Sequence, residues 1–257
     1  MTYTDKQIQA LIAGIEDGSI TEWNLPEGYY SALSDYLKKA VFEGYGNTLA
    51  TVSRLDLPLL EELTTNVYQF SAAKTFQLTK EISGLLVDEN GRVISSREFT
   101  KKARETFENW NDNYGRTEYN TAIAQADSAA KWREIEKQKD ILPYLTYDAV
   151  IDKNTSEICR PLEGITAPVD DPVWKRIAPI NHWNCRCVLK QVEGGETKNN
   201  EKTVQVVEGM MQPMFINNPG ISGQVFTKEH PYFEVAKEYK EYAKNNFNLP
   251  IPNLTKE

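Results

Sequence analysis

Apolar side chains recur at helical spacing through the first third of the chain. Three such stripes occupy residues 4–18, 26–41 and 59–82, where large apolar residues return every three or four positions. This period is typical of amphipathic helices that bury one face. Thr4 and Gln7 have the spacing of a capping box at the start of the first helix, and Gly18 is expected to end it. We therefore predict a helical N-terminal region over residues 1–94.

Two further helices are predicted before residue 143. Ser95 and Glu98 form a second capping-box pair, followed by an apolar face that continues to about residue 113. Gly115 is expected to break this helix because glycine is a poor helix former. The next helical pattern covers residues 117–139, and Pro143 is expected to end the helical part of the chain.

Beyond residue 143 the pattern changes to short β-branched and aromatic runs. Residues 144–151 and 186–192 are predicted to be two paired strands. Four prolines between them, within residues 160–181, indicate an irregular excursion. A linker is expected at 193–200 and an amphipathic helix near 232–247. The predicted fold class is α+β, with helices in the N-terminal two-thirds and a small C-terminal β unit, divided into domains 1–94, 95–192 and 193–257.

Charge and cysteine content exclude several classes of protein. The chain has 29 Lys and Arg against 37 Asp and Glu, a net charge of −8, which argues against broad nonspecific binding to duplex DNA. Apolar runs fall short of the roughly 18 residues of a membrane span, and residues 1–6 lack the layout of a secretory signal, so neither membrane insertion nor classical secretion is expected. Three cysteines, an odd number, do not fit a disulfide scaffold and point to a reducing compartment.

The cysteines and one histidine gather in a single segment. Cys159 is followed by His182, Cys185 and Cys187, and three thiols with one imidazole form a complete tetrahedral shell for Zn²⁺. Cys185 and Cys187 are two residues apart at the start of the predicted return strand, so both face the same side. Four protein ligands leave no open position, which favours a structural zinc over a catalytic one. The alternative is that the thiols are buried small hydrophobes and the histidine is a hydrogen-bonded core residue.

The same segment resembles a known family. The pattern Asp152-x-x-Thr155-x-x-x-Cys159-x-x-Leu162-x-Gly164, followed by Pro179-x-Asn181-His182-x-Asn184-Cys185-Arg186-Cys187, is similar to the C-terminal motif of tailed-phage head morphogenesis proteins, the Mu F-like minor head proteins. The helix start around Arg116 is also similar, and the resemblance covers about residues 95–192. Many members have Cys-x-x-Cys where this chain has Ser156 and Cys159. A metal would therefore use the four candidates above, or the motif is a thiol and hydrogen-bond cluster without metal.

The resemblance implies a minor capsid protein. Such a protein acts with the portal in procapsid assembly and in genome packaging or delivery. Its expected partners are the portal, other head proteins and packaged DNA. It is expected in the virion, in the capsid interior near the portal, and in the host cytoplasm during assembly.

Three motif residues receive structural interpretations. Arg186 lies between two candidate ligands, should face the opposite side of the strand, and is expected to pair with Asp148 or Asp152. Asp152 itself is expected to form a turn. Arg116 is unfavourable at a helix start and is expected to have a partner, either Glu163 or a neighbouring protein.

Other functions were weighed on the residues present. A metal-dependent hydrolase or nuclease, or a toxin-associated enzyme of phage origin, is the alternative, and a nucleic-acid-binding zinc module is a third hypothesis. The chain has no Gly-x-x-x-x-Gly-Lys-Ser/Thr loop and no Gly-x-Ser-x-Gly, and its only histidines are His182 and His230. We predict no catalytic residues and interpret the chain as a non-enzyme.

Overall fold

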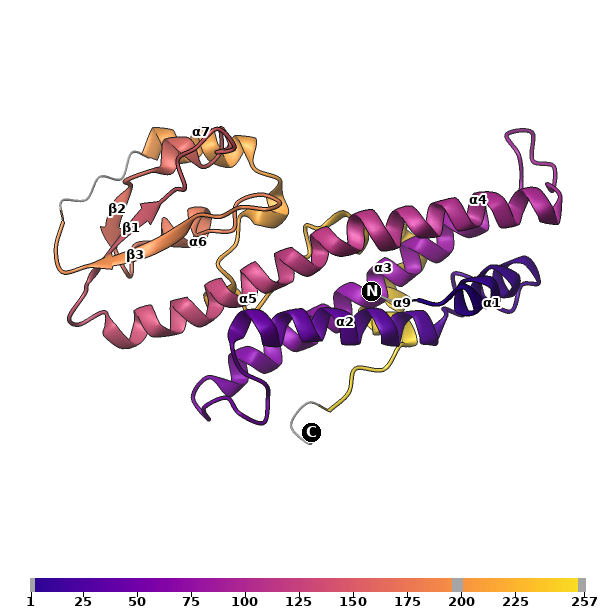
Figure 1. The fold of residues 1–257 in the computed structure, drawn as a ribbon, viewed down its shortest axis with the longest axis horizontal. Coiled ribbons are helices and arrows are strands. Elements are labelled where there is room, and N and C mark those ends of the chain that lie inside the picture. The colour runs from indigo at the N-terminus through magenta and orange to yellow at the C-terminus, as the bar shows by residue number, and fades with distance from the viewer. Residues whose placement is uncertain (1–2, 196–200, 254–257) are drawn as a thin grey trace. The chain divides into compact units, whose positions relative to one another are not determined.

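The computed structural model describes residues 3–195 and 201–253, and it has the predicted α+β class (Figure 1). Among the described residues, unit 1 comprises 3–39, 67–119 and 231–253, and unit 2 comprises 40–66, 120–195 and 201–230. The helices and strands are α1 (Asp5–Glu16), α2 (Glu27–Tyr45), α3 (Leu57–Gly84), α4 (Ser96–Glu108), α5 (Gly115–Gln138), β1 (Tyr144–Asp148), β2 (Thr166–Pro168), α6 (Trp174–Ile177), β3 (Val188–Val192), α7 (Glu201–Met210), α8 (Pro219–Ser222) and α9 (Lys240–Lys244).

The three predicted N-terminal helices are α1, α2 and α3. The Thr4 side chain accepts a hydrogen bond from the Gln7 backbone, and the Gln7 side chain accepts one from the Thr4 backbone, which confirms the capping box. Gly18 adopts a left-handed φ of 79° just after α1 ends. The apolar stripes form the core of unit 1, which buries the side chains of Leu33, Leu37, Phe70, Phe76, Phe99 and Phe107.

The predicted break at Gly115 is wrong. A π-helical turn, Asn109–Tyr114, continues directly from α4, and Gly115 then starts α5 with a helical φ of −58°. A glycine inside a helix costs only about 1 kcal/mol relative to alanine. Burial of Phe107, Trp110 and Glu118 along this stretch outweighs that cost, so the chain stays helical through the glycine.

The predicted helix near 232–247 is replaced by short helical turns. The α-helical part, α9, has five residues, and 3₁₀ turns flank it at Pro231–Phe233, Lys237–Tyr239 and Asn246–Asn248. Gln77 on α3 donates to the backbone carbonyls of Tyr232 and Glu234, and Phe76 stacks on Phe247 at 4.8 Å. These contacts with α3 use backbone carbonyls and an aromatic ring of the C-terminal segment. A continuous helix would place those groups differently, so the segment forms short turns.

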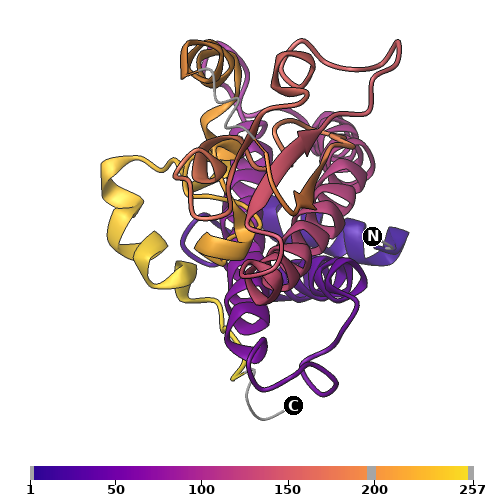
Figure 2. The ribbon, with the colours of Figure 1, turned by 90° about the vertical axis from the view of Figure 1, so that its left-hand side faces the viewer.

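Unit 2 contains a three-stranded antiparallel sheet in the order β2-β1-β3, visible in Figures 1 and 2. The register pairs Tyr147 of β1 with Leu189 of β3, which confirms the predicted pairing of the two strands. The other neighbour of β1, β2, lies inside the proline-rich excursion and was not predicted, because three residues ending in proline carry almost no strand signal.

A single apolar cluster supports this sheet from within unit 2. It joins side chains of α5, β1, α6 and α7, among them Trp132, Leu145, Trp174, Val204 and Phe215. Helix α7 contains the apolar run of residues 204–207. Residues 196–200 of the predicted linker lie outside the described residues. In the described part of the chain, no helix combines the length and apolar content needed to cross a membrane.

Candidate functional site

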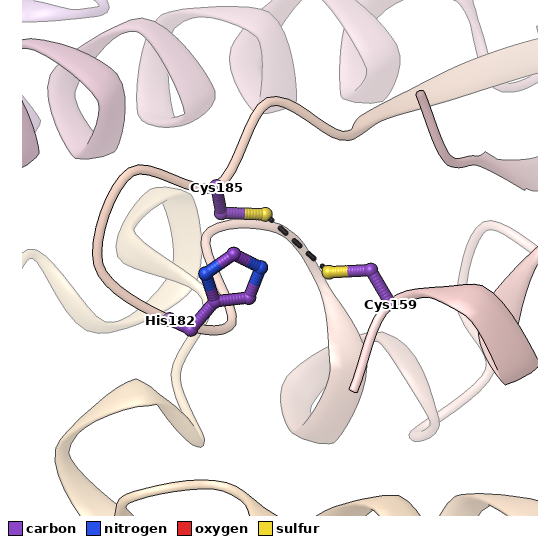
Figure 3. Close-up of side chains that lie close together, drawn as sticks. All are labelled: Cys159, His182 and Cys185. Carbon is purple, nitrogen blue, oxygen red and sulfur yellow. Dashed lines mark hydrogen bonds between the residues drawn. The ribbon is translucent and has the colours of Figure 1, made fainter. Parts of the chain in front are cut away.

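Three of the four candidate ligands meet inside unit 2. Cys159 comes from a turn after β1, and His182 and Cys185 come from the loop before β3 (Figure 3). Their ligand atoms all lie within 4.8 Å of one another, and the Sγ atoms of Cys159 and Cys185 are 3.7 Å apart. Chain positions 26 residues apart are thus brought into contact.

A hydrogen-bonded turn presents Cys159. The Asp152 carboxylate accepts from the Asn154 backbone at 2.8 Å, and the Thr155 hydroxyl donates to the Val150 carbonyl at 2.6 Å. The Ser156 hydroxyl accepts from the Cys159 backbone at 3.1 Å. Ser156 therefore supports the turn through its oxygen.

A second turn presents Cys185. Its backbone N–H donates to the His182 carbonyl at 3.2 Å, and Asn184 between them has a left-handed φ of 60°, a conformation that asparagine tolerates better than most residues. Cys187 follows two residues later and is buried. It lies outside the set of three groups within 4.8 Å, although its thiol interacts with those of Cys159 and Cys185.

The cluster favours an ionised sulfur at Cys159. Hydrogen bonds with Cys185 and Cys187 lower the pKa of Cys159, and the Cys159 sulfur raises the pKa of both neighbouring thiols. The same sulfur raises the pKa of His182. A negative charge concentrated on one sulfur, with further sulfur and nitrogen donors around it, is an environment suited to a cation.

The geometry agrees with a tetrahedral metal. His182 Nδ1 lies 2.8 Å from the Trp183 carbonyl, which can only accept, so Nδ1 is the donor and Nε2 keeps the lone pair that a metal uses. Two sulfurs bound to zinc at about 2.3 Å in a tetrahedron are about 3.8 Å apart. The observed separation of 3.7 Å matches that edge. The Cys/His cluster could therefore hold a metal ion.

A buried network behind the cluster was missed by the sequence analysis. The Tyr147 hydroxyl lies 2.6 Å from Asn181 Oδ1 and 3.4 Å from the Cys159 sulfur. The Asn181 amide in turn donates to the carbonyls of Ile177 and Ala178. The available signal was a tyrosine at an inward position of a strand, since a buried tyrosine hydroxyl needs a partner.

An ion pair ties the two ligand-bearing segments together at the surface. Arg186 binds Asp152 in a bidentate pair, with nitrogen–oxygen distances of 2.8 and 2.9 Å. Asp152 is one of the two partners predicted for Arg186. The other, Asp148, pairs with Lys190 instead. The Arg186 guanidinium lowers the pKa of Asp152 to about 2. Planar fork pairs of this kind fix geometry as well as charge.

The remaining motif residues have structural surroundings. Gly164 has a left-handed φ of 74° and donates its N–H to the Tyr147 carbonyl at 2.9 Å, which places a tight turn beside β1. Glu163 accepts from the Ala149 backbone, so its carboxylate serves the turn beside β1. Arg116 is exposed at the start of α5.

Comparison with known proteins finds relatives that resemble this region. Residues 89–190 match the model of the family described as Phage Mu protein F like protein. The chain is 30% identical over 82 residues to the putative capsid assembly protein F of Escherichia phage Mu, which covers 32% of this chain and 19% of that protein. It is 29% identical over 97 residues to the Mu-like prophage FluMu F protein of Haemophilus influenzae, covering 38% of this chain and 23% of that protein.

Each match covers only part of this chain and only part of the related protein. The chain spans about a fifth of the length of the curated relatives it matches, and no solved structure matches it significantly. The matched range nonetheless contains β1, β2, the Asp152–Arg186 pair and all four candidate ligands. Over residues 89–190, this chain is similar to the Phage Mu F-like family.

Proposed function

We propose that this chain is a head morphogenesis protein, a minor capsid protein of a tailed phage or prophage. It acts with the portal in procapsid assembly and in genome packaging or delivery. The single observation that supports this function is the family match over residues 89–190, since the similar protein of phage Mu is described as a putative capsid assembly protein. The corresponding place is the capsid interior near the portal, reached from the host cytoplasm, with the portal and other head proteins as partners.

The Cys/His cluster contributes to this function as a structural brace, in the form of one bound Zn²⁺. Cys159, His182 and Cys185 supply three ligands, and Cys187 supplies the fourth from the same buried environment. Thiolate and imidazole donors in this number are typical of closed structural zinc sites. The ion would hold the proline-rich excursion to the start of β3, and the domain proposal of 95–192 includes both segments.

The zinc proposal is tested on protein purified without added metal. Elemental analysis should give about one zinc per chain, as expected for a structural site. The Cys185→Ser variant is the matched control and should lose the metal. A content below about a tenth of a zinc per chain in the unmodified protein would contradict the proposal, since a structural site binds tightly enough to survive purification.

The assembly proposal is tested in particles. Mass spectrometry of purified virions and procapsids should find this chain in both or in procapsids alone, and a pull-down with purified portal protein should retain it. A parallel pull-down with the major capsid protein as bait, in place of the portal protein, serves as the control. Absence from both kinds of particle, together with no portal binding, would remove a head-assembly role while leaving the zinc proposal untouched.

A further inference from the structure

We propose that Cys159 and Cys185 form a reversible disulfide site, so that the same two segments are joined by a metal when reduced and by an S–S bond after oxidation by hydrogen peroxide. The metal-bound half of this pair rests on the proposed zinc site. The disulfide half rests on the placement of the two sulfurs alone. A protein assembled in a reducing cell and carried outside it inside a particle would keep its ligand-bearing segments joined in both settings.

The separation of the two sulfurs supports a direct bond. The Sγ atoms are 3.7 Å apart and both are buried, and a disulfide needs about 2.05 Å. The two sulfurs therefore need to approach by less than 2 Å for the bond to form. The two residues come from different segments, so the bond would cross-link the excursion to the strand start, whereas a bond from Cys185 to Cys187 would join residues two apart on one segment.

A small cavity also borders the Cys159 sulfur, although Cys185 does not line it. Cys159, His182 and Cys187 line a cavity of about 20 Å³, bordered by Thr155, Ser156 and Asn184. This volume is close to that of a single water-sized probe. Hydrogen peroxide is one of the smallest oxidants, and the polar border of the cavity can hydrogen-bond it as it approaches Cys159.

The chemistry balances with peroxide as the only added reagent. The Cys159 thiolate attacks one peroxide oxygen, an S–O bond forms, the O–O bond breaks, and the departing hydroxide takes a solvent proton to become water. The Cys185 thiol sulfur then attacks the Cys159 sulfur, the S–S bond forms, the S–O bond breaks, and the departing hydroxide takes the Cys185 thiol proton to leave as a second water. Two electrons pass from the sulfurs to the peroxide, and zinc leaves as the unchanged divalent ion.

The test uses the full, unmodified chain. The protein is treated with a zinc chelator and then with hydrogen peroxide, its remaining thiols are alkylated, and its peptides are mapped by mass spectrometry. The expected main product is a peptide pair linked through Cys159 and Cys185, with Cys187 alkylated. Thiol reduction should reverse it. In the same samples, residues 150–187 should resist protease after chelation plus peroxide and be cleaved after chelation alone.

Two variants sharpen the outcome. Cys187→Ser should still form the cross-link, and Cys185→Ser should not. A dominant Cys185–Cys187 pair, a link between two chains, or sulfinic acid without a cross-link would overturn the proposal. Zinc content is measured before oxidation, so the two ideas fail separately. A cross-link in protein that never held zinc supports the disulfide site and contradicts only the zinc proposal. Bound zinc without a cross-link after oxidation supports the zinc proposal and contradicts the disulfide site.

Discussion

The two units stabilise their polar interiors in different ways. Unit 1 buries a complete ion pair, Lys74 with Glu118, whose side chains are 0% and 3% exposed. The Lys74 ammonium also donates to the Trp110 carbonyl at 3.0 Å and lies over the rings of Trp110 and Tyr232. Lys74 lies on α3 and Glu118 on α5, beside the stacked rings of Trp110 and Tyr232, so the geometry of the pair is set by regular elements.

Unit 2 has little regular structure around its polar groups. Its strands have five, three and five residues, and the segments that carry the thiols are loops. The buried groups there are joined to each other through Tyr147, Asn181 and the thiol cluster. Where helices do not fix the positions of buried groups, contacts between side chains have to fix them. The two units should therefore respond differently to metal removal and to mutation.

The largest expected effect is that of metal removal on unit 2. Zinc contributes on the order of 10 kcal/mol or more to small zinc-binding peptides. Chelation should therefore raise the rate of proteolysis within residues 150–187 more than about tenfold, which corresponds to about 1.4 kcal/mol of local opening. Cleavage within unit 1, in residues 67–84 of α3 and in α4, should not change. Equal rates before and after chelation in metal-loaded protein would show that the cluster does not brace the loop.

The next effect concerns the buried pair of unit 1. Lys74→Met leaves the Glu118 carboxylate buried without its partner and should lower the free energy of unfolding by about 3–5 kcal/mol, measured by urea denaturation. Lys101→Met is the matched control, because the Lys101 side chain is 77% exposed, and it should change stability by less than about 0.5 kcal/mol. Similar values for the two variants would contradict burial of the pair.

A smaller effect is expected for Tyr147. The Tyr147→Phe variant keeps the ring in the core but leaves Asn181 Oδ1 without its donor, which costs about 1–2 kcal/mol. Tyr144→Phe, on the same strand and only partly buried, should have no measurable effect. The comparison is made by thermal unfolding at constant zinc. A Tyr147→Phe protein as stable as the control would mean that Asn181 finds another donor.

The smallest effect is expected for the surface ion pair of Arg186 with Asp152. Asp152→Asn removes the charge that pairs with Arg186, and exposed ion pairs contribute little to stability. The stability difference from the unmodified protein should shrink as salt is added, because salt screens exposed charges. Asp148→Asn, which breaks the exposed pair with Lys190, is the control of the same type. A loss that is large and independent of salt would show that Asp152 acts through its turn instead.

The local features were predictable because their causes are local. Periodic apolar residues and the Thr4 and Ser95 caps set the starts of α1 and α4, since a helix cap is decided within three residues. The pairing of β1 with β3 followed from the β-branched and aromatic runs, and Arg186 was expected to pair with Asp148 or Asp152, of which Asp152 is its partner. Chemistry also pointed to the thiols, because their residue types allow few other uses.

The parts that were missed depend on contacts between distant residues. Gly115 reads locally as a helix break, yet packing of Trp110 and Glu118 keeps the chain helical through it. The C-terminal residues read as an amphipathic helix, yet Gln77 and Phe76 hold them as short turns. β2 has no signal of its own and exists because β1 offers it an edge.

By itself, then, the sequence determined where α1 and α4 begin, that β1 pairs with β3, and which residue types carry the chemistry. The tertiary structure alone decided that Cys159 lies 3.7 Å from Cys185, that Tyr147 reaches both Asn181 and Cys159, and that Lys74 meets Glu118. The physical reason is that periodicity and capping act over a few residues. A sulfur–sulfur contact or a buried ion pair, by contrast, is set by the packing of whole elements, which no short stretch of sequence contains.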